Sequence, residues 1–107
     1  MTKYKIDPWT ALGDPTRRAI FERIAYKARA VGEIARDVPV SRPAVSQHLK
    51  VLKDAGLVHD HAIGTRRIYS VNTDGLSVLR HDLERFWSRA LVNFKQLVEL
   101  DNEDDES

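Results

Sequence analysis

Residues 41–57 limit the possible folds of this chain more than any other stretch does. Val45, Leu49 and Leu52 recur at helical spacing, so the stretch predicts a helix with one face in a hydrophobic core. Ser41 is a good N-cap for this helix, and Gly56 can adopt the left-handed conformation that ends many helices. The predicted helix is therefore anchored along one side, and its other side is free to contact another molecule.

The free side of this predicted helix carries side chains that can bind nucleic acid. They are hydrogen-bonding or positively charged: Ser46, Gln47, Lys50 and Lys53. Gln can form two hydrogen bonds with an adenine edge, and Ser can bond to either type of base pair. The pattern favours a helix that enters a DNA major groove. The alternative is a charged amphipathic helix in a small bundle.

Three shorter helices are predicted before residue 41. Asp7 and Asp14 each precede a proline, which favours helix starts at residues 8 and 15. Residues 31–35 predict a third helix, although Ala30 is a weak cap. The break at 38–40, followed by the helix from Ser41 onward, predicts a helix-turn-helix arrangement.

The pattern changes to period two after this helix. Residues 57–63 and 66–71 predict two β-strands, and Gly64 favours a tight hairpin turn between them. A β-hairpin directly after a recognition helix is a wing. Arg66 and Arg67 lie at its turn, where they can reach phosphates or a minor groove.

Residues 75–100 predict a long helix, capped by Thr73 or Asp74, with an extended apolar stripe. The stripe follows alternating steps of three and four: Leu76, Leu79, Leu83, Phe86, Trp87, Ala90, Phe94 and Leu97. It is longer than the core of so small a domain needs, so we expect it to pair with a second copy of the chain. The alternative is a stripe that serves only the intramolecular core.

Charge is distributed unevenly along the chain. Residues 1–72 contain 13 Lys and Arg against 7 Asp and Glu, whereas residues 73–107 contain 4 against 9. The basic part is where nucleic acid would bind. Residues 101–107 contain five acidic side chains and no apolar one. We therefore expect one folded domain over 1–100 and an acidic, disordered tail over 101–107.

Several other classes of protein are disfavoured. No apolar run approaches the roughly 20 residues that span a membrane, and no apolar signal segment follows the N-terminus, so we expect a cytoplasmic protein without a membrane partner. The absence of cysteine removes thiolate metal sites and thiol chemistry. No acid–base constellation surrounds any serine, so we expect neither enzymatic activity nor a cofactor.

The order of the predicted elements and four motifs resemble the ArsR/SmtB family of bacterial and archaeal winged-helix repressors. The motifs are Ala-Leu-Gly-Asp-Pro-Thr-Arg-Arg at 11–18, Val-Ser-Gln-His-Leu at 45–49, Leu-Lys-Asp-Ala-Gly-Leu-Val at 52–58 and Gly-Thr-Arg-Arg-Ile-Tyr at 64–69. The resemblance covers the chain from about residue 9 to residue 100. It implies a mainly α fold with a small β-hairpin. It also implies a homodimer, joined through the first and last helices, that binds double-stranded DNA at an inverted-repeat operator and is released by an inducer.

The resemblance implies roles for individual residues. Base edges would be contacted by Ser46, Gln47 and His48, although His48 is alternatively a partly buried packing residue. The phosphate backbone would be held by Ser41, Arg42, Lys50 and Lys53, and the adjacent groove by Thr65, Arg66 and Arg67. Trp9 would join the apolar stripe in the dimer interface.

The chain departs from the family at both of its known kinds of metal site. Many members sense metal through cysteines in the helix before the recognition helix, or through Asp and His pairs in the last helix. Residues 31–37 contain no cysteine, and His81 has no His ten to twelve residues further on. His59 and His61 share one strand face, but zinc normally needs three or four ligands. The chain is similar to the branch without recognised metal ligands. A repressor that senses metal through its histidines, or a winged-helix module for protein or RNA, is the alternative.

Overall fold

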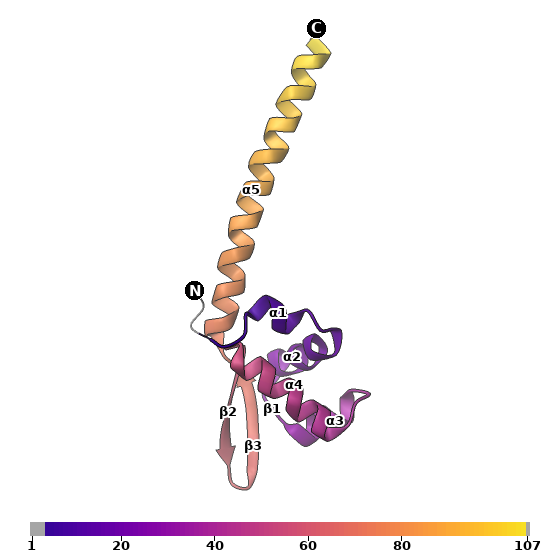
Figure 1. Ribbon diagram of the computed structural model, residues 1–107, viewed down its shortest axis with the longest axis vertical. Helices are drawn as coiled ribbons and strands as arrows, with labels where there is room; N and C mark the ends of the chain where they lie inside the picture. The colour runs from indigo at the N-terminus through magenta and orange to yellow at the C-terminus, as the bar shows by residue number, and fades with distance from the viewer. Residues whose placement is uncertain (1–3, 107) are drawn as a thin grey trace.

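The computed structural model describes the backbone of residues 4–106 and the side chains of residues 4–102. Its elements, in chain order, are α1 (Pro8–Leu12), α2 (Pro15–Tyr26), β1 (Arg29–Ala30), α3 (Val31–Asp37), α4 (Arg42–Asp54), β2 (Val58–Ile63), β3 (Arg66–Val71) and α5 (Thr73–Glu106). Figure 1 shows a head from which one long helix projects. We call residues 4–79 the head and residues 80–106 the outer α5.

The helix starts follow the predicted capping residues. The carboxylates of Asp7 and Asp14 and the hydroxyl of Ser41 each accept the backbone N–H three residues on, at 3.1, 2.9 and 3.3 Å. Ala30 provides no side-chain cap for α3; instead, Glu33 Oε1 accepts a hydrogen bond of 3.2 Å from the N–H of Ala30. Each of these helices therefore starts with one of its free N–H groups satisfied locally.

The hydrophobic core lies between α2, α3, α4 and the base of the wing. Its buried side chains are Ala11, Ile20, Phe21, Ile24, Ile34, Val38, Val45, Leu49, Leu52, Ala55, Leu57 and Val58. The three α4 residues predicted to face inward, Val45, Leu49 and Leu52, all have 0% exposure, which confirms the predicted inner face. Burial of one such side chain contributes about 1.5–3 kcal/mol, so this face holds α4 firmly on the head.

The wing belongs to a three-stranded antiparallel sheet with the order β1-β3-β2. β2 and β3 form the predicted hairpin, and Gly64 at its turn has a φ of +63°. β1 adds Arg29 and Ala30, which pair with Tyr69 and Ile68 of β3. The sequence does not predict β1 because two residues are too few for a period-two pattern.

The end of α4 and the start of α5 meet at two glycines. Gly56 has a φ of +73° and ends α4 as predicted, and its carbonyl oxygen accepts a hydrogen bond of 2.9 Å from the N–H of Gly75. A Cβ on Gly75 would lie 2.5 Å from that oxygen, so the contact requires glycine. The predicted cap of α5 is wrong, because Thr73 is already helical. Asn72 Oδ1 accepts the N–H of Asp74 at 3.1 Å instead.

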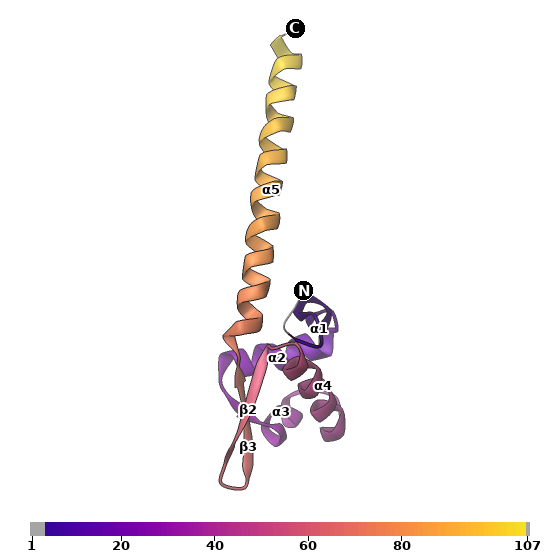
Figure 2. The same cartoon turned by 60° about the vertical axis from the view of Figure 1, so that its left-hand side comes forward.

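Beyond the level of α1, α5 has no other element of the described chain beside it, as Figures 1 and 2 both show. The molecule therefore measures 73 Å along its longest axis and only 29 and 21 Å along the others. The helix continues to Glu106, whereas the sequence predicts an end near residue 100. Extension of an existing helix adds one hydrogen bond per residue without a new nucleation cost. None of the described helices is long and apolar enough to cross a membrane.

Candidate nucleic-acid interface

The polar side of α4 faces solvent, where α4 runs along the outside of the head (Figure 2). Ser46, Gln47 and Lys50 are exposed on this side, as predicted. Ser41 and Arg42 are exposed at the start of the helix. Within the described part of the chain, Lys50 makes no ion pair, so its charge is available to a phosphate.

His48 differs from its neighbours on α4 because it is half-buried. It lies near Asp14 at the start of α2. The pKa of the Asp14 carboxyl is lowered chiefly by the N–H of Arg17, and the charges of Arg17 and His48 add to the effect. His48 is therefore less accessible to a DNA base than Gln47 is.

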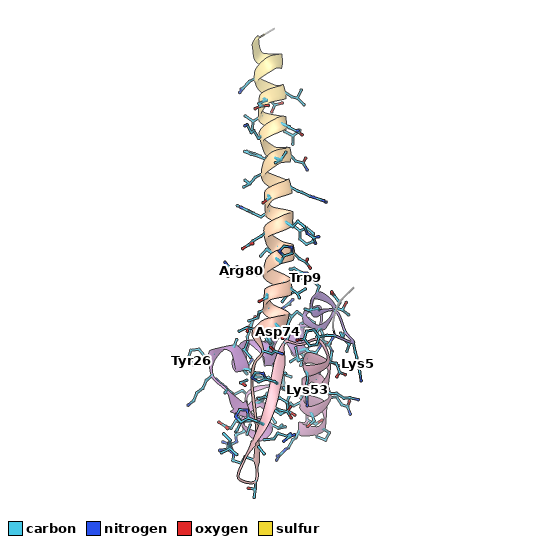
Figure 3. The ribbon with its side chains drawn as sticks, turned by 90° about the vertical axis from the view of Figure 1, so that its left-hand side faces the viewer. Lys5, Trp9, Tyr26, Lys53, Asp74 and Arg80 are labelled. Atoms are coloured by element: carbon cyan, nitrogen blue, oxygen red, sulfur yellow. The ribbon has the colours of Figure 1, made fainter. Side chains whose placement is uncertain are left out.

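Two predicted DNA contacts, Lys53 (labelled in Figure 3) and Arg67, share the carboxylate of Asp60. Lys53 Nζ lies 2.8 Å from Asp60 Oδ1, and Arg67 Nε lies 2.6 Å from Asp60 Oδ2. The hydrogen bond from Lys53 is the main cause that lowers the pKa of Asp60, and the same bond raises the pKa of Lys53. Both cations are bound within the protein rather than free. The sequence predicts them as DNA contacts and does not predict the Lys53–Asp60 pair.

Arg66 is paired as well. Its Nη2 contacts Oε1 of Glu33 in α3, the same oxygen that accepts the N–H of Ala30. The pKa of Glu33 is lowered chiefly by the Ala30 hydrogen bond, with the charge of Arg66 contributing further. The Arg66 side chain is still 59% exposed, so a phosphate can approach it from solvent.

A cleft of about 310 Å³ lies between α3, the start of α4 and the turn of the wing. Guanidinium groups dominate its polar lining, which consists of Arg36, Arg42, Arg66, Arg67, Thr65 and Glu33. Four guanidinium groups against one carboxylate leave the lining net positive, and such a cleft attracts anions. The sequence does not single out Arg36, because one Arg in a short helix forms no pattern. Arg42 and Thr65, in contrast, are part of the predicted DNA-binding set.

The predicted dimer-interface residues fall into two groups. Leu76 and Leu79 are partly buried against the core of the head, so they contribute to the intramolecular core rather than to a free surface. Periodicity cannot make this distinction, because both kinds of burial produce the same apolar spacing. The remaining stripe residues are exposed: Leu83, Phe86, Trp87, Ala90, Phe94 and Leu97.

Trp9 connects α1 to α5 within the chain. Its Nε1 donates a hydrogen bond of 2.9 Å to Asp82 Oδ2, and its ring centroid lies 6.4 Å from that of Phe86 (Figure 3). Trp9 is nevertheless 41% exposed. It therefore widens the apolar stripe at the point where α5 leaves the head.

The three histidines considered as metal ligands, His59, His61 and His81, are all exposed. Across the residues that the structure describes, no group of three or more His, Cys, Asp or Glu side chains is placed to hold a metal ion.

Comparisons with known proteins agree with this geometry. Residues 12–61 match the family model of a helix-turn-helix domain. The chain is 60% identical over 96 residues to the HTH-type transcriptional regulator Rv2034 of Mycobacterium tuberculosis (strain ATCC 25618 / H37Rv), and the match covers 90% of each protein.

Two solved structures are similar over most of the chain. An ArsR-like transcriptional regulator from Rhodococcus sp. RHA1 is 32% identical with a TM-score of 0.68, covering 83% of this chain and 87% of that one. The homodimeric winged helix-turn-helix DNA-binding domain of Mb0332 from Mycobacterium bovis, a possible ArsR-family transcriptional regulator, is 27% identical with a TM-score of 0.62, covering 76% and 75%. The predicted winged helix-turn-helix fold is confirmed, and the chain belongs to the ArsR/SmtB family of transcriptional regulators.

Proposed function

We propose that this protein is a homodimeric repressor that binds an inverted-repeat operator, with one α4 helix in each half-site. The exposed polar side of α4, held rigidly by its buried side and flanked by the wing, is the observation that carries the proposal. Resemblance to winged-helix repressors favours repression over activation.

Ser46 and Gln47 read base edges in this proposal, because their hydrogen-bonding groups are exposed at the centre of α4. Lys50 and Arg42 contact phosphates. The acidic end of α5 lies at the opposite end of the molecule from the wing turn (Figure 1), so its charges stay far from the DNA. Phosphate neutralisation then supplies much of the affinity, which falls as salt rises.

The outer α5 supports a dimer. Phe86, Trp87, Phe94 and Leu97 are 52–65% exposed along one helix, and exposed apolar patches of this kind mark interaction surfaces. The homodimeric state of the similar Mb0332 domain adds support. Two-fold symmetry would place the two α4 helices in half-sites about one or two helical turns apart. A signal that changes their distance or tilt would release the DNA by a population shift.

The test is selection of bound duplexes from random DNA with the full chain. We expect an inverted repeat whose half-sites match the two-fold axis. Gln47→Ala then relaxes base preference at one position in each half-site, at a cost of roughly 1–3 kcal/mol. Lys50→Ala instead weakens binding to every duplex and lowers the salt dependence. Direct readout by Gln47 is wrong if Gln47→Ala weakens all sequences equally.

Repression itself is tested with a reporter gene placed under a promoter that contains the selected duplex. We expect co-expression of the wild-type protein to lower the reporter output and Gln47→Ala to restore it. An increase in output with the wild-type protein contradicts repression without contradicting DNA binding.

A further inference from the structure

We propose that Asp60 determines DNA-binding specificity as a positioning residue, because it holds the cations of Lys53 and Arg67 at fixed places beside the recognition helix. This inference rests on the proposed function. It assigns a role to a carboxylate that makes no contact with DNA itself.

The ion-pair geometry is that of one buried anion between two half-exposed cations. The Asp60 side chain is 5% exposed, whereas those of Lys53 and Arg67 are 52% and 56% exposed. Each carboxylate oxygen takes one cation, at 2.8 Å from Lys53 Nζ and 2.6 Å from Arg67 Nε. An exposed ion pair contributes little, but charge-assisted hydrogen bonds to both oxygens of a covered carboxylate are stronger and restrict its partners.

The two cations come from different elements. Lys53 lies in the last turn of α4, and Arg67 lies in β3, one residue after the first residue of that strand. Asp60 therefore ties the end of the recognition helix to the wing. The Lys53–Asp60 pair joins α4 to the wing, and the Asp60–Arg67 pair joins the two strands of the wing itself.

The hairpin register sets the position of Asp60. Asp60 pairs with Tyr69, two residues from Arg67 on β3, so the three side chains share one face of the sheet. His59 and His61 lie on the opposite face. The Tyr69 pKa is raised mainly by burial, with the charge of Asp60 as a second cause.

The consequence concerns which DNA the protein prefers. A free Lys or Arg gains from phosphates of any sequence, so it strengthens nonspecific binding. A cation held on a buried carboxylate is partly neutralised and gains only where a phosphate reaches its fixed position. Asp60 thereby lowers affinity for random DNA more than affinity for the correctly shaped operator.

The experiment compares the full chain with its Asp60→Asn variant, which keeps the shape of the side chain and removes its charge. The probes are the duplex that the wild-type protein selects from random DNA and a scrambled duplex of the same composition. Dissociation constants are measured by fluorescence anisotropy across a series of KCl concentrations, after circular dichroism has confirmed the fold.

We expect Asp60→Asn to bind the scrambled duplex about tenfold more tightly. The slope of log affinity against log KCl concentration becomes steeper by about one, because one negative charge is removed from between the two cations. Affinity for the selected duplex changes by less than about threefold, so the ratio of the two affinities falls. The inference is overturned if Asp60→Asn changes neither the ratio of the two affinities nor the salt dependence of binding to the scrambled duplex. If the wild-type protein itself selects no duplex, the proposed function is wrong and the inference falls with it.

If Asp60→Asn does not fold, substitutions of two lysines on α4 still test the inference. Lys50→Met and Lys53→Met remove one charge each, one turn apart on α4, and keep an apolar stem. Lys50 makes no ion pair within the described residues, so Lys50→Met lowers the salt slope on the scrambled duplex by about one. Lys53→Met lowers the slope by less than Lys50→Met does, since Asp60 already partly neutralises Lys53. Equal losses of slope in the two variants overturn the inference.

Discussion

The head and the outer α5 differ in what covers their apolar side chains. In the head, Ile20, Leu49 and Leu52 have no exposed surface at all. In the outer α5, Phe94 and Leu97 are 65% and 61% exposed. The head is stabilised by contacts within the chain, whereas Trp9 alone reaches the apolar face of the outer α5 among the described residues, near Phe86. One sequence thus encodes a packed core and an exposed apolar surface suited to a second molecule.

The largest effect is expected when the same substitution, Leu→Ala, is made once in each of the two regions. Leu52→Ala leaves a cavity in the core, so we expect a loss of about 2–5 kcal/mol in the free energy of unfolding. Leu97→Ala removes an exposed side chain, and we expect a change within about 0.5 kcal/mol at protein concentrations low enough to keep the chain monomeric. Urea unfolding measures both. Similar losses would show that the outer α5 has cover within its own chain.

The next effect concerns the apolar face of the outer α5. Phe94→Glu places a charge in the proposed interface, so we expect the dimer dissociation constant to rise by a factor that corresponds to about 2–4 kcal/mol. Val92→Glu is the matched control, because Val92 is 55% exposed but lies two residues away, on the other side of the helix. Sedimentation equilibrium distinguishes them. A wild-type monomer at micromolar concentration contradicts the proposed dimer, and equal behaviour of the two variants contradicts the assigned face.

A smaller effect is expected at the junction between the two regions. Gly75→Ala would bring a Cβ to 2.5 Å from the backbone oxygen of Gly56, and we expect a loss of about 1–3 kcal/mol from overpacking. Gly32→Ala is the control, since the nearest atom would be 3.8 Å away in the side chain of Arg42. Alanine favours a helix over glycine, so Gly32→Ala should stabilise the protein by up to about 1 kcal/mol. Thermal unfolding that ranks the two variants in the reverse order would contradict the close contact.

The smallest effect is a pH dependence within the head. Lys53 and Arg67 lower the pKa of Asp60 in the folded state below its unfolded value of about 4. The resulting stabilisation is fully present above that unfolded value and is lost as the pH falls through the lowered, folded pKa. We therefore expect the urea midpoints of the wild type and Asp60→Asn to differ most at neutral pH and to converge below about pH 4. If the difference between the two urea midpoints stays constant from pH 7 to pH 3, the ionisation of Asp60 is not its cause.

Much of the head could be predicted because its determinants are local. Ser41 caps α4, Gly56 ends it and Gly64 forms the turn of the wing, each for a reason contained in a few neighbouring residues. Local patterns do not predict which surface covers Leu76 and Leu79. Their spacing indicates burial, but it does not reveal whether the covering surface belongs to the same chain.

The candidate site was less predictable than the fold. The polar face of α4 follows from helical spacing, but the ion pairs of Arg66 and Lys53 join residues that are distant in sequence or lie on different elements. The Asp60–Arg67 pair is an exception. The two-residue turn fixes the hairpin register, and that register alone places opposite charges on neighbouring positions of one face.

The direct backbone contact between Gly56 and Gly75 has a mechanical consequence for the proposed dimer. No side chain lies between them, so the end of α4 and the start of α5 are joined directly by a backbone hydrogen bond. When two copies cross through their outer α5 helices, a change in the crossing angle turns both recognition helices with it. Spin labels on α4 of each copy would report this as a change in their separation. An effector bound far along α5 can then alter operator binding without approaching the DNA.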